Sequence, residues 1–370
     1  MNPEEDVIRE LKKAGASIAL TLPCDRVKAL HMLMVKEFFH VPLTSEEEGV
    51  GISAGAALAG LKPVMLIQSS GLGNMVNALA SLSLFYELPL FLLVSWRGVY
   101  KETIAAQRPM GLLVPRLLEA MGIECIEIER RDEIQKIASF AKRAFEEGRV
   151  KAPLLNPKVW EGSTLGADWD AEKRIGEERE FKSMEKLAMH TRYEILNGVR
   201  EGLWGKAVVC NLGVPAKELY HACHQSSNFY MLGSMGMATP IGLGIALGSQ
   251  KEVVVIDGDG SLLMNPGTLA TVAEMATENL SILAIDNAAH GSTGNQPTAT
   301  KDKAQLEMLA RAMGIKNTAQ STLPVEVMEL MHNGRGPRFV HIIAKPGNAN
   351  VGEIPLTPQK IKQNVMGFLR

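Results

Sequence analysis

Short apolar runs alternate with helix-like stretches along most of the chain. The eight clearest runs are ASIALTL (16–22), PVMLIQ (63–68), LPLFLLVSW (88–96), IECIEI (123–128), AVVCNL (207–212), EVVVID (252–257), LSILAID (280–286) and FVHIIA (339–344). Runs that are apolar on both faces are typical of parallel strands covered by helices. The pattern therefore predicts an α/β protein with two doubly wound parallel-sheet domains.

The two series of runs are separated by a polar, charged segment that is poor in strand formers. We interpret residues 156–185 as a linker that ends in a helix, between a first domain of residues 1–155 and a second of residues 186–370. The first 15 residues predict an amphipathic helix with acidic residues in its first turn. A chain of 370 residues, 46% of them hydrophobic, suits two domains with a core each, although one domain stays possible.

Charge and cysteine content exclude several classes of function. The formal net charge is -2 and there are no long like-charge runs, so nothing favours a nucleic-acid partner. Four cysteines without CxxC spacing favour a reducing compartment, with the cytoplasm as the expected location, and argue against a zinc site. No apolar run has the length of a membrane span and the N-terminus lacks a signal-peptide core, so we expect no membrane association.

Polar side chains follow two successive strands of the second series. The strand over 252–257 leads into Gly258, Asp259, Gly260 and Ser261, and Asn287 follows the end of the next strand. Because the carboxyl ends of parallel strands face one crevice, Asp259 and Asn287 can contact a single hard cation such as Mg²⁺. The two glycines allow a sharp turn and the approach of a diphosphate, and Ser261 is expected to cap the following helix.

Two other kinds of loop could carry a GDGS string. A calcium-binding EF-hand loop requires glycine at its sixth position and glutamate at its twelfth, and the chain has Leu262 and Thr268 there. A glycine-rich turn without a ligand stays open if the GDGS string is taken alone.

A second candidate for phosphate binding lies upstream, in LGSMGMATPIGLGIALG (232–248). This string reads as a strand end that opens a helix, whose amide groups can bind a diphosphate at the positive end of the helix dipole. Gly233, Ser234 and Gly236 are the expected contacts. Met235 on its own is interpreted as an ordinary core residue.

The spacing of GDGS and Asn287 resembles the cofactor motif of thiamine-diphosphate-dependent enzymes. The resemblance implies a Mg²⁺ ion held by Asp259, Asn287 and the main-chain carbonyl of Ala289. It also implies that Met235 supports the cofactor in a bent shape, with the cofactor's diphosphate bound by the two glycine-rich strings.

The first half contains a matching signature, TSEEEGVGISAGAALAG (44–60). It resembles the pyrimidine-binding motif of the same family, in which the catalytic glutamate is followed by a small residue three positions on and glycine nine positions on. Glu46 keeps that register, with Gly49 and Gly55, whereas Glu47 and Glu48 are interpreted as first-turn residues favoured by the helix dipole. Taken alone, three glutamates would indicate a solvated face.

The resemblance gives Glu46 a chemical role. A carboxylate bonded to the aminopyrimidine ring favours the tautomer that removes the thiazolium proton. The nucleophile so formed attacks the ketone of a 2-oxoacid, which then loses carbon dioxide.

Further strings are similar to the small sulfopyruvate decarboxylases of coenzyme M biosynthesis and, more distantly, to phosphonopyruvate decarboxylase. They are LPCD (22–25), QSSGLGNMVNALASL (68–82), SWRG (95–98), AQRPMG (106–111), NLGVPAKELY (211–220) and GSTGNQPT (291–298). The resemblance implies a fused form of two subunits without a central domain. It also implies a homo-oligomer, a dimer or tetramer, with active sites between subunits. His290 departs from the pattern, which has tyrosine there.

An anionic substrate tail needs cationic or amide donors in its pocket. The candidates for substrate contacts are Gln68, Ser69, Ser70, Asn74, Arg97, Gln107, Arg108 and Lys217, with Gln296 as a weaker one. Each is also compatible with a surface or helix-capping role. His290 could relay a proton, and His221 and His224 are expected to have no catalytic role.

Three hypotheses about function stay open at this point. The first is a lyase that converts 3-sulfopyruvate to sulfoacetaldehyde and carbon dioxide, with phosphonopyruvate as the alternative substrate. The second is a related carboligase that joins two carbonyl compounds. The third is a non-catalytic module that binds thiamine diphosphate or a nucleotide and needs no carboxylate at position 46.

Overall fold

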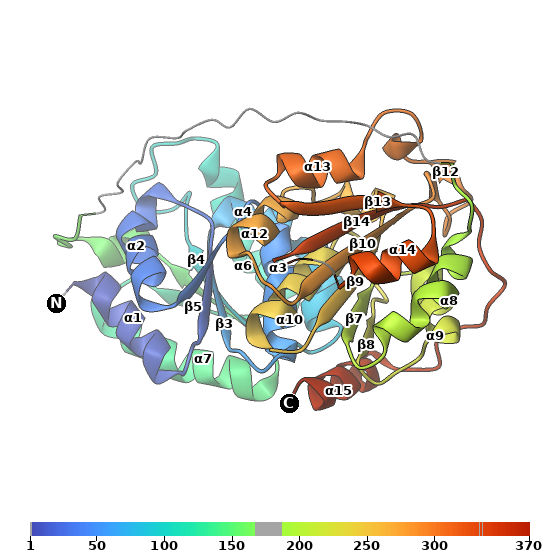
Figure 1. Cartoon of the computed structure of the whole chain (residues 1–370). Coiled ribbons are helices and arrows are strands. Elements are labelled where there is room, and N and C mark those ends of the chain that lie inside the picture. The colour runs from blue at the N-terminus through green and yellow to red at the C-terminus, as the bar shows by residue number, and fades with distance from the viewer. Residues whose placement is uncertain (1, 167–186, 333, 335) are drawn as a thin grey trace.

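The computed structural model describes residues 2–166, 187–332, 334 and 336–370 (Figure 1). This part of the chain forms two six-stranded parallel sheets and a two-stranded ribbon. The first sheet has, from edge to edge, the strands β2 (Phe39–Pro42), β1 (Ile18–Thr21), β3 (Pro63–Gln68), β4 (Leu90–Ser95), β6 (Val150–Leu155) and β5 (Glu124–Ile128). The second has β13 (Asn317–Ser321), β14 (Arg338–Ile343), β10 (Leu280–Asp286), β9 (Val253–Gly258), β7 (Ala207–Cys210) and β8 (Asn228–Tyr230). The predicted α/β class with two parallel sheets is confirmed.

Helices cover both faces of each sheet (Figure 1). Those of the first half are α1 (Pro3–Lys13), α2 (Lys28–Glu37), α3 (Glu46–Leu58), α4 (Ser69–Asn74), α5 (Val76–Ala78), α6 (Gln107–Ala120) and α7 (Lys136–Glu147), with a π-helical turn over Leu79–Leu84. Those of the second half are α8 (Arg192–Leu203), α9 (Val214–Ala222), α10 (Ala238–Gly248), α11 (Asp259–Leu262), α12 (Thr268–Met275), α13 (Leu306–Ala312), α14 (Pro324–Leu330) and α15 (Pro358–Leu369). None of the helices described is long and apolar enough to cross a membrane.

The eight strands expected from the apolar runs are all present, with ends shifted by at most a few residues. The sequence patterns missed the two short strands of the ribbon, β11 (Ala289–His290) and β12 (Gln296–Pro297), and four strands of the sheets, β2, β6, β8 and β13. The four strands of the sheets were missed for physical reasons. Strands β2, β8 and β13 lie at or beside sheet edges, are three to five residues long and carry polar side chains. Strand β6 includes Lys151, which is buried because it pairs with Glu124 and Glu147 at 2.5 and 2.8 Å. The helix expected at the end of the linker falls on residues 167–186, outside the described residues.

The two halves meet where helices α3 and α10 lie side by side between the sheets (Figure 1). Two glycines bring the helix backbones together. A Cβ atom on Gly55 would lie 2.0 Å from the carbonyl oxygen of Ile241, and one on Gly244 would lie 2.1 Å from that of Ile52. Their contact joins one face of the first half's core to the core of the second half in one apolar cluster, while the other face of the first sheet has a separate cluster. The close packing therefore fixes how the amino ends of α3 and α10 sit relative to each other.

Candidate active site

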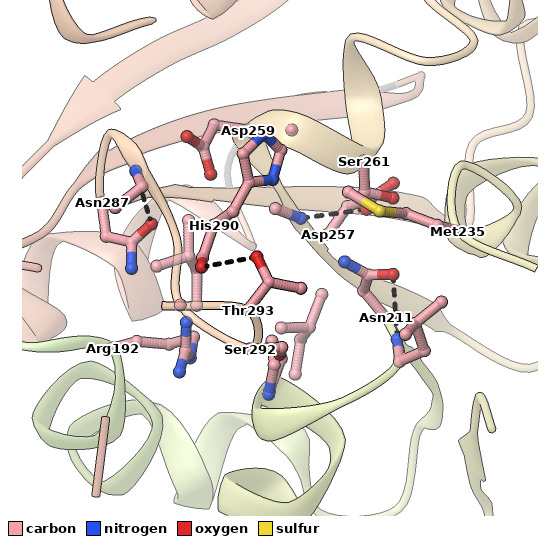
Figure 2. A pocket seen from close by; sticks show the side chains of 18 residues that line it. Arg192, Asn211, Met235, Asp257, Asp259, Ser261, Asn287, His290, Ser292 and Thr293 are labelled. Carbon is pink, nitrogen blue, oxygen red and sulfur yellow. Dashed lines mark hydrogen bonds between the residues drawn. The ribbon is translucent and has the colours of Figure 1, made fainter. Parts of the chain in front are cut away.

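A pocket opens at the carboxyl ends of strands β7, β9 and β10 (Figure 2). It has about 680 Å³ of empty space, counting its open mouth. Its lining includes Met235 and the run from Gly258 to Ser261, together with Asn287, Ala289 and His290. Most of the sequence-predicted metal and cofactor residues of the second half thus lie around one pocket, whereas Gly233, Ser234 and Gly236 are not among its lining residues. The amino ends of α9 and of the short helix α11 also face it.

Asp259 is the buried acid of this pocket. It begins α11, its Oδ2 accepts a hydrogen bond from the hydroxyl group of Thr298, and the hydroxyl oxygen of Thr300 lies 3.2 Å from the same Oδ2. Burial raises the pKa of the Asp259 carboxyl, the hydrogen bond from Thr298 lowers it, and the nearby Asp286 carboxylate raises it. A cation bound here would relieve the cost of holding this charge away from water.

Asn287 lies beside Asp259 at the end of β10 and is 3% exposed. Its Oδ1 accepts the N–H of Ala289 at 3.3 Å, while its buried Nδ2 has no hydrogen-bond partner among the described residues. Ala288, between them, has φ of +55°. Residues other than glycine rarely adopt this left-handed backbone conformation. Where they do, the strain is often found at functional sites.

These observations fit a magnesium site. One carboxylate, one side-chain amide and a main-chain carbonyl in a strained loop are oxygen donors of the kind that Mg²⁺ accepts, and they leave positions for phosphate oxygens. The described residues contain no group of three or more His, Cys, Asp or Glu side chains that could hold a metal.

The loop before α10 forms another wall of the pocket. Ser234 has φ of +60° and Gly236 has φ of +92°. The N–H of Gly236 donates to the hydroxyl of Ser261 at 3.1 Å, which joins this loop to the GDGS turn. The prediction that Ser261 caps the next helix is wrong, since Ser261 lies inside α11, whose N-cap is Gly258. Its hydroxyl connects the two glycine-rich loops instead.

His290 and Met235 close the pocket around Gly260. A Cβ atom on Gly260 would lie 2.5 Å from Cε1 of His290 and 3.4 Å from Cε of Met235, so this position requires glycine. In Figure 2, Asp259, Asn287 and His290 lie toward one side of the pocket, and Arg192, Ser292 and Asn211 toward the other. His290 thus lines the same pocket as the expected metal ligands, and its role in proton transfer stays a prediction.

Glu46 lies in the other half of the molecule, at the amino end of α3. Ser45 and Glu48 form the capping box that starts this helix, which agrees with a first-turn role for Glu48. Glu46 is 5% exposed, and its Oε2 accepts a hydrogen bond from Nδ2 of Asn74 at 3.0 Å. Gly71 leaves room for it, because a Cβ atom there would lie 2.3 Å from Oε1. Glu46 is therefore a buried, oriented carboxylate.

The chain does not place Glu46 in the pocket of its own second half. All the described residues that line the pocket belong to the second half, and Arg192 has the lowest number among them. The nearest links between the two halves run beside the site. Glu47 accepts from Asn265 at 3.2 Å, and the hydroxyls of Ser81 and Ser234 are 2.6 Å apart.

The predicted substrate residues fall into two groups. Most of them lie on the first half, at or near the carboxyl edge of its sheet: Gln68, Ser69, Ser70, Asn74, Arg97, Gln107 and Arg108. Lys217 lies on α9 and pairs with Glu353 at 2.5 Å, and Gln296 is exposed and bonded to Thr293. None of these nine lines the pocket described above, and their role in substrate binding stays a prediction.

Arg97 is engaged by acidic neighbours. It is 2% exposed, donates to both oxygens of Glu102 at 2.7 and 2.9 Å, and donates to Asp25 at 2.5 Å. These hydrogen bonds lower the pKa of Glu102 to about 2. By contrast, the buried Oε1 of Gln107 has no partner among the described residues.

Sequence reasoning missed several pocket residues. Arg192 begins α8, donates to Glu218 at 2.6 Å and to Asn348 at 2.9 Å, and lines the pocket. Asn211 and Ser292 line it as well, within the strings NLGVPAKELY and GSTGNQPT that signalled the family without marking individual residues. Thr298 and Thr300 were also missed, because a threonine hydroxyl on a distant loop has no motif of its own.

Comparisons with known proteins agree with this geometry. Residues 211–342 match the family model described as the thiamine pyrophosphate enzyme, C-terminal TPP binding domain. A sulfopyruvate decarboxylase of Methanosarcina acetivorans is 44% identical, over 97% of this chain and 96% of that protein. A phosphonopyruvate decarboxylase of Streptomyces viridochromogenes is 29% identical, over 98% of this chain and 94% of that protein.

Two separate subunits each match a little less than half of the chain. In Methanococcus maripaludis, the beta subunit of sulfopyruvate decarboxylase is 39% identical over 49% of this chain, and the alpha subunit is 36% identical over 44% of it. Each match covers 98% of the subunit. Among solved structures, a thiamine diphosphate-dependent 4-hydroxybenzoylformate decarboxylase of Rhodococcus jostii covers 94% of this chain and 100% of that chain, with a TM-score of 0.71 and 12% identity. That likeness shows the fold alone.

Proposed function

Since this chain belongs to the sulfopyruvate decarboxylase family, we propose that it converts 3-sulfopyruvate to sulfoacetaldehyde and carbon dioxide with thiamine diphosphate and Mg²⁺. The observation that supports this most is the pocket that brings Asp259, Asn287 and Ala289 together beside two glycine-rich loops. Such a set suits a diphosphate carried on a hard cation.

The residues of the second half would anchor the cofactor. Asp259, the Oδ1 of Asn287 and the carbonyl of Ala289 would hold Mg²⁺. The strained loop at Ser234 and Gly236, and the turn at Gly258 and Gly260, would offer N–H groups to the diphosphate. When bound, thiamine diphosphate supplies a carbon nucleophile and an electron sink for decarboxylation.

Proton transfer would involve Glu46 of the first half and His290 of the second. Glu46 would hold a proton at the ring nitrogen of the aminopyrimidine, and its hydrogen bond from Asn74 keeps the carboxylate in one orientation. Asn74 was predicted as a substrate contact, and its bond to Glu46 supports a role in positioning this acid. His290 is a candidate for moving a proton at the reacting carbon, from its place beside Gly260.

A partner subunit would complete the site. The pocket lining contains no described residue of the first half, so a carboxylate must come from elsewhere if the family mechanism holds. We propose a homodimer in which Glu46 of one subunit serves the cofactor held by the second half of the other. This arrangement would also explain why relatives have the two halves as separate subunits.

Subunit mixing tests the shared site. Glu46→Gln and Asp259→Asn proteins should each be inactive, while random mixing should restore up to about one quarter of the wild-type activity, because mixed dimers regain one intact site. Mixing that restores nothing, although exchange is verified by two affinity tags, would contradict the shared site and leave the decarboxylase assignment standing.

The substrate test compares three 2-oxoacids. Carbon dioxide release should depend on both thiamine diphosphate and Mg²⁺, and kcat/KM should be highest for 3-sulfopyruvate, with phosphonopyruvate second and pyruvate lowest. Faster turnover of phosphonopyruvate would replace the proposed substrate by the alternative suggested by the more distant relative. A carboligation product from pyruvate would indicate the carboligase instead.

A further inference from the structure

We propose that His341 and Asp286 are positioning residues that hold the expected Mg²⁺ ligands of this chain in place. The inference rests on the proposed function and concerns residues outside the motif. Neither side chain lines the pocket, yet both are buried directly behind its metal-binding edge.

His341 lies on β14, the strand next to β10, opposite Ala284 in register. It is 1% exposed, and its Nε2 is 2.8 Å from Oδ2 of Asp286. Its buried Nδ1 has no partner among the described residues. The contact with Asp286 is therefore the one hydrogen bond described for this ring, and it fixes the side of the ring that faces the carboxylate.

The other carboxylate oxygen of Asp286 contacts the loop that carries the expected metal ligands. Its Oδ1 accepts the N–H of Ala288 at 2.9 Å and the hydroxyl of Thr300 at 2.7 Å. The bond to Ala288 stabilises a backbone with φ of +55°, a conformation that an alanine rarely adopts. That backbone sets the direction of the Ala289 carbonyl, one of the three expected ligands.

Thr300 lies between Asp286 and the acidic ligand. Its hydroxyl is 3.2 Å from Oδ2 of Asp259 and 2.9 Å from the hydroxyl of Thr298, which donates to Asp259. A hydroxyl has one proton to donate, so Thr300 cannot serve both carboxylates at once. The short contact with Asp286 decides its orientation, and Thr298 is left to hold Asp259.

The path from His341 to the expected ligand Ala289 is thus continuous. It runs from His341 to Asp286 and then to the backbone of Ala288, and it ends on the carbonyl of Ala289. Groups that orient metal ligands in this way commonly change metal affinity about 10- to 100-fold when they are removed. A buried histidine that served packing alone would affect stability and leave the metal affinity unchanged.

The test measures Mg²⁺ affinity directly in the full-length protein. Binding of thiamine diphosphate is followed by isothermal titration calorimetry at graded Mg²⁺ concentrations, which gives an apparent Kd for Mg²⁺ without turnover. His341→Leu, which cannot donate to Asp286, should raise this Kd about tenfold or more. His341→Gln retains an N–H donor and should stay within about threefold of wild type.

Two further variants separate positioning from folding. Thr300→Val leaves the His341–Asp286 contact intact and should also raise the Kd for Mg²⁺, because it removes the hydroxyl that Asp286 binds. His31→Leu is the matched control, since His31 is a buried histidine of the first half that bonds Thr21 at 2.8 Å, away from the pocket. It should lower stability and leave the Kd for Mg²⁺ unchanged.

The outcomes distinguish this inference from the function on which it rests. If the wild-type protein takes up no thiamine diphosphate at any Mg²⁺ concentration, the proposed function fails and the inference with it. If the wild type binds and His341→Leu and Thr300→Val match it, the positioning role alone is overturned. An equal loss in His31→Leu would also overturn it, because the effect would then be one of general stability.

Discussion

The carboxyl edges of the two sheets are built for different tasks. At the edge of the first sheet, Arg97 satisfies its guanidinium group with Glu102 and Asp25. At the edge of the second, Asn287 keeps an unpartnered buried amide among the described residues, and Ala288 is held in a left-handed conformation. The buried cation of the first edge is balanced by its own acidic side chains, with the Oε1 of Gln107 left without a partner among the described residues, whereas the second edge carries cost and strain that a ligand would relieve.

The contrast indicates a different role for each half of the chain. The edge of the second sheet has a buried polar group without a partner and a strained backbone, and both features suit an anchor for a charged cofactor. Glu46 belongs to the first half, where Asn74 and Gly71 surround it, and a single orientation suits a group that must exchange a proton at a fixed place.

The largest expected effect comes from removing the acidic ligand of the second edge. Asp259→Asn should weaken Mg²⁺ binding roughly a hundredfold or more and abolish measurable decarboxylation at ordinary Mg²⁺ concentrations, because the ion loses its one charged ligand. Calorimetry with thiamine diphosphate gives the affinity. Asp257→Asn is the control, because burial raises the pKa of that carboxyl and its oxygens bind Thr239 and Gly258. Equal losses in both variants would contradict the assignment.

The next expected effect tests whether Glu102 stabilises the buried Arg97 at the edge of the first sheet. Glu102→Gln leaves the buried Arg97 with one acidic partner, and we expect the free energy of unfolding to fall by about 3 kcal/mol in urea titrations. Glu161→Gln removes an exposed partner of Lys101 and should cost less than about 1 kcal/mol. If Glu102→Gln keeps its stability and instead changes KM for the 2-oxoacid, Arg97 is a substrate group, as its sequence context predicted.

A smaller effect should appear on acidification, again in the first half. Burial and, to a smaller extent, the neighbouring His31 lower the pKa of His40 to about 4, so the unfolded chain takes up a proton in a pH range where the folded chain does not. Stability contributed by the neutral ring is complete above about pH 6.5 and is lost as the pH falls through about 4. The loss should be about 2 kcal/mol, below the full value of the shift because His40 is only half-buried.

His40→Gln should make the acid limb of the stability curve shallower between those pH values, as measured by urea unfolding at each pH. A variant with an unchanged slope would show that other groups govern this limb.

Much of this architecture was predictable from the sequence. Buried parallel strands are apolar along their whole length, so β3, β4, β9 and β10 could be recognised with ends close to those observed. The metal and cofactor residues of the second half could be placed together because Asp259 and Asn287 follow neighbouring strands. Local rules were sufficient where sequence neighbours and spatial neighbours coincide.

What could not be predicted depends on contacts between distant segments. Arg192 enters the pocket from the start of α8, and Thr298 and Thr300 reach Asp259 across about forty residues of chain. His341 meets Asp286 only because β14 lies beside β10. The hydrogen bonds of Arg97 likewise depend on tertiary packing, because Glu102 accepts two of them. The sequence pattern indicated a cation available to a substrate, whereas the fold pairs this cation with acidic neighbours.

The central claim is that Glu46 on the first edge activates a cofactor anchored by the second. The most direct measurement compares Glu46→Gln with Glu47→Gln, its neighbour on α3, which accepts a hydrogen bond from Asn265. We predict that both variants bind thiamine diphosphate and Mg²⁺ by calorimetry, while carbon dioxide release from 3-sulfopyruvate falls roughly a hundredfold or more in Glu46→Gln and less than about threefold in Glu47→Gln. A Glu46→Gln protein that binds the cofactor and decarboxylates at the wild-type rate would contradict the account.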